Sequence, residues 1–253
     1  ALRRLVEQVN DARQRHGALH IRGGGTKPFG AAPAAGEALD LRPLAGISSH
    51  EPTELVVTVR AGTPLRELEA ALAEHGQCLP FEPPRFDAPA AAEAAPGATS
   101  PRERVTPELH EAAAGGTVGG MVAAGLAGPS RVAVGSVRDH LLGATMLNGR
   151  GEVLSFGGQV MKNVAGYDLC RVLAGSMGVL GVILEVSLKV LPRPPALTTL
   201  AFDVGQEQAL ALLTGWRRLP LPVHASSWHE GRLRLRLAGA RAAVLAAADR
   251  LGS

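Results

Sequence analysis

The stretch RGGGTK, residues 22–27, directly follows a short apolar segment, and the rest of the chain can be interpreted outward from it. Successive glycines can turn backbone N–H groups to one side and leave no Cβ to hold an anion away, which makes a nest for phosphate groups. The spacing is not that of a Walker loop, because no GxxxxG precedes Lys27, and it is not GxGxxG. A plain tight turn with a solvated Lys27 is the alternative. We predict a pyrophosphate-binding loop.

A second glycine-rich loop, GGTVGG at residues 115–120, lies far along the chain, and GSVRD follows at residues 135–139. Two separate small-residue loops would let one elongated ligand lie against the backbone of both. A mononucleotide does not need two such loops, whereas a dinucleotide does. Close packing of strands without a ligand is the alternative. The pair of loops therefore predicts a dinucleotide site.

The segments around the first loop alternate between helix and strand patterns. Residues 2–16 carry one apolar stripe and end before Gly17, which suits a helix with a glycine cap. Residues 19–22 and 55–60 are typical of strands. A helix follows the second, with Thr63 as its cap, Pro64 in its first position and Gly76 at its end. This alternation predicts parallel strands joined through helices.

The second half of the chain changes character. Residues 87–114 mix Ala, Pro, Glu and Ser without an apolar period, which predicts an exposed, mobile loop. Residues 144–156 suggest a hairpin around GRG, and residues 179–191 one long strand. That strand carries an apolar face of alternate residues: Val182, Leu184, Val186, Leu188 and Val190.

A proline-rich linker at residues 192–195 leads to the C-terminal region. The pattern there predicts a strand near 198–204, a helix over 206–216, a hairpin turning at Glu230 and Gly231, and a helix over 240–251. This βαββα unit is too small to be more than an accessory lobe.

Composition excludes several classes of protein. With 46% hydrophobic and 19% charged residues, a chain of 253 residues can bury a core, and it lacks the roughly 18 uninterrupted apolar residues of a membrane span. Scattered basic residues, a net charge of +3 and few aromatic side chains argue against a nucleic-acid partner. The distant Cys78 and Cys170 predict a reduced, cytoplasmic compartment and no iron–sulfur cluster, and His224 and His229 lack metal-ligand spacing.

Six ordered motifs resemble a known family. They are IRGGGTK (21–27), EPTELVVTVRAGTPLRELEAAL (51–72), LPFEPPRF (79–86), GGTVGGMVAAGLAGP (115–129), GSVRDHLLG (135–143), and the stretch from KNVAGYDL to GSMGVLGVI (162–183). Together they resemble the FAD-binding subunits of bacterial glycolate oxidase, within the vanillyl-alcohol-oxidase/p-cresol-methylhydroxylase (PCMH) superfamily. The resemblance implies a two-lobed α+β fold, with a PCMH-type FAD-binding domain over residues 1–195 and a small cap lobe over residues 196–253.

The resemblance also implies which residues bind FAD. The first pyrophosphate loop corresponds to Gly23, Gly24, Gly25, Thr26 and Lys27; the segment passing the flavin to Pro83 and Pro84; the second FAD loop to Thr117, Gly119 and Gly120; the cofactor cleft to Gly135 and Asp139; and the backbone facing adenine to Gly178, Gly181, Val182 and Ile183. A buried Asp139 carboxylate could accept ribityl or ribose hydroxyl protons; capping a helix or pairing with Arg138 is its alternative. Lys162 faces the flavin or solvent, and Tyr167 suits a core.

The departures from the family pattern limit what is carried over. Many superfamily members have two Asn side chains in the second loop where this chain has Met121 and Gly125. The first loop contains no histidine, so we expect FAD to be bound without a covalent bond. No general base is visible, and the catalytic residues are unknown.

The function that the resemblance implies is oxidation of glycolate to glyoxylate with hydride transfer to flavin. The expected partners are a homologous larger flavoprotein subunit and an iron–sulfur subunit, which could also attach this chain peripherally to the inner membrane. The alternatives are a non-catalytic assembly subunit and a flavin subunit that oxidises D-lactate or another 2-hydroxy acid. We expect the isolated chain to turn over glycolate poorly.

Overall fold

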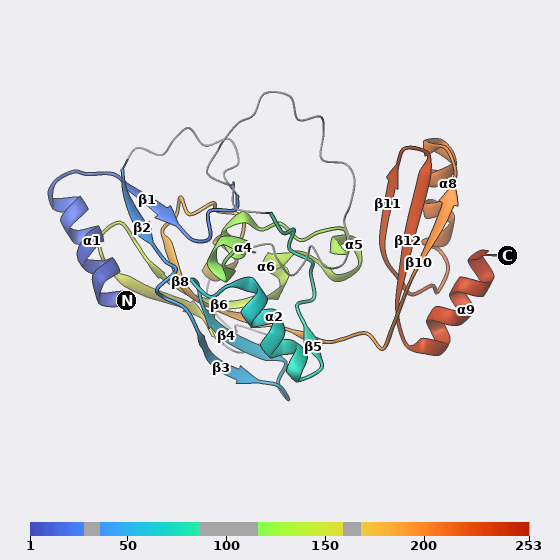
Figure 1. The fold of residues 1–253 in the computed structure, drawn as a ribbon, viewed down its shortest axis with the longest axis horizontal. Helices are drawn as coiled ribbons and strands as arrows, with labels where there is room; N and C mark the ends of the chain where they lie inside the picture. Colours follow the sequence, from blue (N-terminus) through green and yellow to red (C-terminus); the bar gives the residue numbers. More distant parts are fainter. Residues whose placement is uncertain (28–35, 87–115, 159–167, 253) are drawn as a thin grey trace, which may run out of the picture.

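The structure, a computed structural model, describes residues 1–27, 36–86, 116–158 and 168–252 (Figure 1). The predicted loop over 87–114, together with Lys162 and Tyr167, lies outside these ranges. The predicted α+β class is confirmed, since helices pack on sheets that are mostly antiparallel.

A five-stranded antiparallel sheet forms the centre, in the order β3-β4-β8-β6-β7. Its strands are β3 (Ile47–Glu51), β4 (Val56–Arg60), β6 (Leu141–Leu147), β7 (Val153–Gly157) and β8 (Val182–Lys189). The prediction of parallel strands is wrong for this sheet, because a tight turn at 52–55 joins β3 to β4 and a tight turn can only reverse the chain. Only β1 (Leu19–Arg22) and β2 (Glu37–Asp40) pair in parallel among the described strands.

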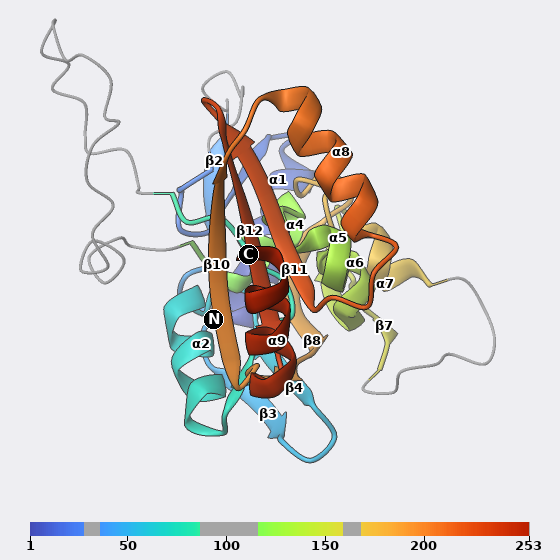
Figure 2. The same cartoon turned by 90° about the vertical axis from the view of Figure 1, so that its right-hand side faces the viewer.

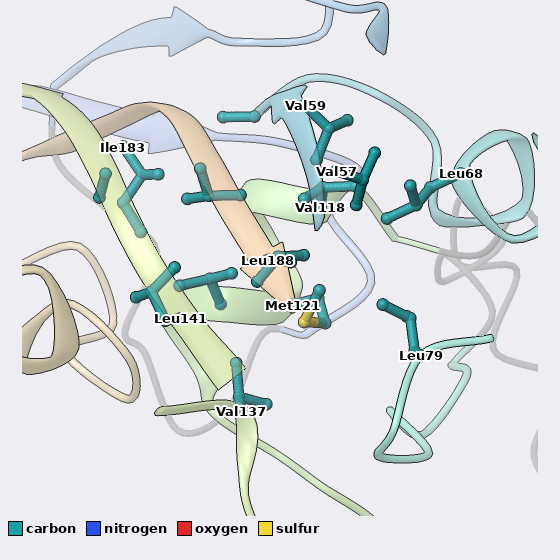
Figure 3. Close-up of a cluster of buried hydrophobic side chains, with 14 of the residues drawn as sticks. Val57, Val59, Leu68, Leu79, Val118, Met121, Val137, Leu141, Ile183 and Leu188 are labelled. Carbon is teal, nitrogen blue, oxygen red and sulfur yellow. The ribbon is translucent and has the colours of Figure 1, made fainter. Parts of the chain in front are cut away.

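The larger buried core lies between this sheet and two helices, α2 (Leu65–Glu74) and α4 (Val118–Ala124). Figure 3 shows how its side chains meet: Val57 of β4 and Leu188 of β8 approach Leu68 of α2 and Val118 and Met121 of α4. All five are at most 1% exposed. At about 1.5–3 kcal/mol for each fully buried large apolar side chain, this packing fixes α4 on the sheet.

A β-bulge divides the apolar residues of β8 between two cores. Thr145 lies opposite Glu185 while Met146 lies opposite Ile183, so Leu184 is an extra residue in β8. An extra residue reverses the alternation of side chains. Val186 therefore faces the larger core, whereas Val182 and Leu184 face a second core formed with α1 (Leu2–Gln14). The prediction of a single apolar face is wrong for this reason.

Two predicted helix caps are also corrected. The left-handed residue that ends α1 is His16, one position before Gly17. Thr63 does not cap α2, because its hydroxyl exchanges hydrogen bonds with the backbone of Gly46, and Pro64 is the residue before the helix. The predicted end at Gly76 is confirmed by its left-handed backbone.

Short elements complete this part of the fold. Strand β5 (Gln77–Cys78) pairs with β9 (Leu191–Pro192), and three single-turn helices follow the second glycine loop. They are α5 (Arg131–Val134), α6 (Val137–His140) and α7 (Leu169–Val172). None of the described helices is long and apolar enough to cross a membrane.

The C-terminal residues 196–252, here called the cap lobe, form the predicted βαββα unit. Its elements are β10 (Ala196–Asp203), α8 (Gln206–Trp216), β11 (Val223–His229), β12 (Arg232–Gly239) and α9 (Arg241–Gly252). The sheet order is β10-β12-β11. Figures 1 and 2 show α8 and α9 on the side of this sheet that faces away from α4 and α5. The hairpin turns at Glu230 and Gly231, both left-handed, as predicted.

Candidate functional site

The two predicted glycine loops meet. An added Cβ on Gly23 would lie 2.5 Å from Oγ1 of Thr117, and one on Gly24 would lie 3.1 Å from Cα of Gly116. Contacts this close leave no room for a side chain at either glycine. The loop after β1 and the loop before α4 therefore form one continuous surface of main chain.

The second loop is held by the turn between β4 and α2. The N–H of Val118 donates to the carbonyl of Thr63 at 2.9 Å, and the N–H of Gly119 donates to the carbonyl of Ala61 at 2.8 Å. A Cβ on Gly119 would lie 2.6 Å from Cβ of Ala61. The start of α4 is thus fixed by hydrogen bonds and by close contact, which makes its loop a rigid wall.

A third segment, residues 177–183, closes the arrangement. The N–H of Met177 donates to the carbonyl of Ala123 in α4 at 2.9 Å. The Cβ position of Gly178 lies 3.4 Å from the side chain of Ile21 in β1. This segment therefore contacts both α4 and β1, the two elements that border the glycine loops.

These three segments enclose a cavity of about 680 Å³. That volume lies within the range of about 300–1,000 Å³ typical of ligand and cofactor sites. Most residues predicted to bind the cofactor line it: Gly23, Gly24, Gly25, Thr26, Lys27, Thr117, Gly119, Gly120, Gly178, Gly181 and Ile183.

Five predicted residues are not among those lining the cavity. Val182 points into the second core because the strand alternates there. The carboxylate of Asp139 accepts hydrogen bonds from the N–H of Ser136 at 2.7 Å and from its hydroxyl at 2.8 Å, so it belongs to a capping box of α6. Asp139 is exposed, and the structure agrees with the alternative in which its side chain caps a helix. Its neighbour in space, Gly135, and the half-buried Pro83 and Pro84 are the others.

The charges of the cavity are positive. Its titratable lining residues are His20, Arg22 and Lys27, and no carboxylate is among the described lining residues. Burial lowers the pKa of Lys27, whose Nζ lies 3.5 Å from the hydroxyl of the buried Thr26. An anion placed beside Lys27 would offset the cost of burying its charge.

Pattern reasoning missed several lining residues. Ala123 and Ala124 are small residues of α4, and Met177 and Val179 are 51% and 82% exposed. The resemblance places the segment from Gly178 to Ile183 at the cofactor, but exposure of single side chains such as Met177 and Val179 cannot be read from a sequence.

The two cysteines do not line this cavity. Cys170 is buried, and burial is the main cause that raises the pKa of its thiol to about 12. Within the ranges that the structure describes, no group of three or more His, Cys, Asp or Glu side chains could hold a metal ion.

Comparison with known proteins bears directly on this cavity. Residues 3–103 match the family described as FAD binding domain. The chain is 43% identical over 248 residues to glycolate oxidase subunit GlcE of Escherichia coli (strain K12), covering 98% of this chain. The chain is thus similar to an FAD-binding domain over residues 3–103 and to this glycolate oxidase subunit over nearly all of its own length. A solved structure of alkyldihydroxyacetonephosphate synthase has the same fold, with a TM-score of 0.70 over 98% of this chain and 47% of that one, at 16% identity.

A more distant relative is D-lactate dehydrogenase of Archaeoglobus fulgidus, 28% identical over 213 residues. That alignment covers 81% of this chain and 40% of the dehydrogenase, and the alignment with the Escherichia coli subunit covers 63% of that subunit. The chain thus spans less than two thirds of the length of either relative.

Proposed function

We propose that this chain is the FAD-binding subunit of a glycolate:acceptor oxidoreductase, which oxidises glycolate to glyoxylate with hydride transfer to flavin. The observation that carries the proposal is the cavity where two glycine loops meet beside two cations. The identity to a glycolate oxidase subunit supports the choice of substrate. In this proposal residues 1–195 are the FAD-binding domain and residues 196–253 a small cap lobe.

The residues present fit FAD. Its diphosphate carries negative charge, and Arg22 and Lys27 are the cations beside the main chain of Gly23 to Gly25. The close contact of Gly24 with Gly116 leaves backbone N–H groups without covering side chains. The apolar Met177 and Val179 beside Gly178 suit a base. The first loop contains neither His nor Cys, which supports non-covalent binding.

Bound FAD would supply the hydride acceptor. The chain's own part is to hold the diphosphate, to fix the ring and to keep water out. Among the described lining residues, His20, Arg22 and Lys27 are the only titratable groups, and none of them is assigned as a general base. We therefore propose that the isolated chain turns over glycolate poorly. The full activity would need a homologous larger flavoprotein subunit and an iron–sulfur subunit, with which the chain works in the cytoplasm or at the inner membrane.

An absorption spectrum of the purified chain tests cofactor binding. We expect flavin bands near stoichiometric occupancy, and flavin released into the supernatant when the protein is denatured by acid. A colourless protein that does not take up added FAD would refute the proposal and favour a non-catalytic assembly subunit.

The second candidate substrate is D-lactate, which the Archaeoglobus fulgidus relative favours. Reduction of a dye by the assembled complex, measured separately with glycolate and with D-lactate, distinguishes the two. We expect glycolate to be the better substrate by kcat/KM.

A further inference from the structure

The boundary between residues 1–195 and the cap lobe contains no continuous apolar core among the described residues. The larger core and the second core contain no buried residue beyond Val190. The buried cluster of the cap lobe runs from Leu235 to Ala247, and the side chains packed on it come from residues 196–251. Hydrophobic burial is the dominant favourable term in most stable contacts. Here the buried apolar clusters stabilise each part internally and do not continue across the boundary.

The chain itself leaves the first part at one anchored point. The N–H of Arg193 donates to the carbonyl of Gly76 at 2.8 Å, and Pro194 and Pro195, which follow, have no N–H to donate. Between the described residues on either side of this boundary, we find no backbone hydrogen bond. The cap lobe is thus tied to the first part mainly by side chains.

One ion pair crosses the boundary among the described residues. Arg236 of β12 donates from its guanidinium to the carboxylate of Glu82. Glu82 is fixed to the first part, since its N–H donates to the carbonyl of Ala127 at 3.0 Å and its carbonyl lies against Gly128. The pair therefore joins a rigid loop, just before Pro83, to the central strand of the cap lobe.

The same junction buries polar atoms that lack partners. Nε of Arg236 and Nδ1 of His224 in β11 are buried without a hydrogen bond among the described residues. Burial is the main cause that lowers the pKa of His224; the charge of Arg236 lowers it further, and the charge of Glu82 raises it. A buried polar group without a partner is unfavourable, and that cost is recovered when water reaches the group. The closed junction therefore carries a cost that opening removes.

We propose that the Glu82–Arg236 pair is a latch, and that the cap lobe moves away from residues 1–195 as a unit when it breaks. The proposal goes beyond the proposed function and does not depend on FAD or on any substrate. This movement costs little free energy, because the face of β12 opposite the helices carries charged side chains. They are Arg232, Arg234 and Arg236, which alternate along the strand. Breaking the contact exposes charged side chains to water and leaves the apolar clusters of both parts buried.

The test compares two carboxylates that each pair with an arginine of β12. Glu82→Gln removes the partner of Arg236 across the boundary, and Asp203→Asn removes the partner of Arg232 within the cap lobe. Amide hydrogen exchange in α5, which packs against β11, reports opening. We expect Glu82→Gln to raise exchange in residues 131–134 about threefold to tenfold and to increase the radius of gyration. Asp203→Asn should change neither. Equal effects of the two variants, or no effect of Glu82→Gln, would overturn the latch.

A variant of opposite sign keeps the test independent of folding defects. His224→Phe replaces a ring whose Nδ1 has no partner with an apolar ring of similar size. We expect it to lower exchange in α5 about threefold, because water no longer competes for that nitrogen. Unchanged or faster exchange in His224→Phe would show that the junction is satisfied when closed, and would overturn the proposal.

Discussion

Replacing Lys27 with Met should weaken FAD binding while sparing the apoprotein. The side chain lies against Thr26 at the wall of the cavity, and the substitution keeps most of its length and removes its charge. A hydrogen bond to a charged group contributes about 1.5–3 kcal/mol, which corresponds to a roughly 10- to 150-fold rise in the Kd for FAD.

The stability of the apoprotein should move the other way. Burial lowers the pKa of Lys27, so the folded state disfavours its charge. Removing the charge removes that cost, and the Tm without FAD should stay the same or rise slightly. A variant that binds FAD weakly only because it is misfolded would lose Tm instead.

The assay is a titration of apoprotein with FAD, followed by quenching of flavin fluorescence at two salt concentrations. Lys189→Met is the matched control, because it lowers the net charge equally from a position that does not line the cavity. Its effect on Kd should be small and should vanish at high salt. An equal loss in both variants, or an unchanged Kd in Lys27→Met, would refute the assignment of Lys27 to the diphosphate.

Three further outcomes are expected. Gly119→Ala should lower the free energy of unfolding by about 1–3 kcal/mol, because its Cβ would lie 2.6 Å from Cβ of Ala61; thermal unfolding would measure this. Gly215→Ala in α8, where a Cβ meets nothing within 4 Å, should raise stability by about 0.5–1 kcal/mol, and a lower Tm there would contradict the packing described. Because the pKa of Cys170 is raised to about 12, its stabilising contribution is complete below the ordinary thiol pKa and is lost as pH rises through 12. In the native protein at pH 8 its reaction with a thiol reagent should be much slower than after unfolding, and equal rates would rule out a buried, protonated thiol.

The cavity could be predicted because its walls come so close to other parts of the chain that only glycine fits there, and a run of glycines is visible in the sequence. Gly23, Gly24 and Gly119 each lie where a Cβ would collide with another part of the chain. Asp139 could not be placed in the same way, since a carboxylate has many possible partners. Its spacing from Ser136 fits a capping box as well as a ligand, and the structure shows the capping box.

Topology was harder to predict than local structure. Strands of parallel and antiparallel sheets share one alternation, so the direction of β4 depended on a turn. That turn begins at Pro52, a common turn residue, but it also uses Leu55 in a left-handed conformation, for which leucine carries no signal. The bulge at Leu184 could not be predicted either. Strand β8 has apolar residues on both faces, so the sequence pattern does not mark the position where the side chains change sides.

The walls of the cavity are drawn from positions early, middle and late in the first part of the chain. During synthesis on a ribosome, residues 23–27 emerge long before residues 177–183, so a nascent chain cannot complete this site until most of that part has been made. A ligand that binds only the folded form shifts the folding equilibrium toward that form. The supply of coenzyme should therefore affect how long the finished protein survives. Cells short of riboflavin should accordingly contain less of this chain through faster degradation, even with its messenger RNA unchanged.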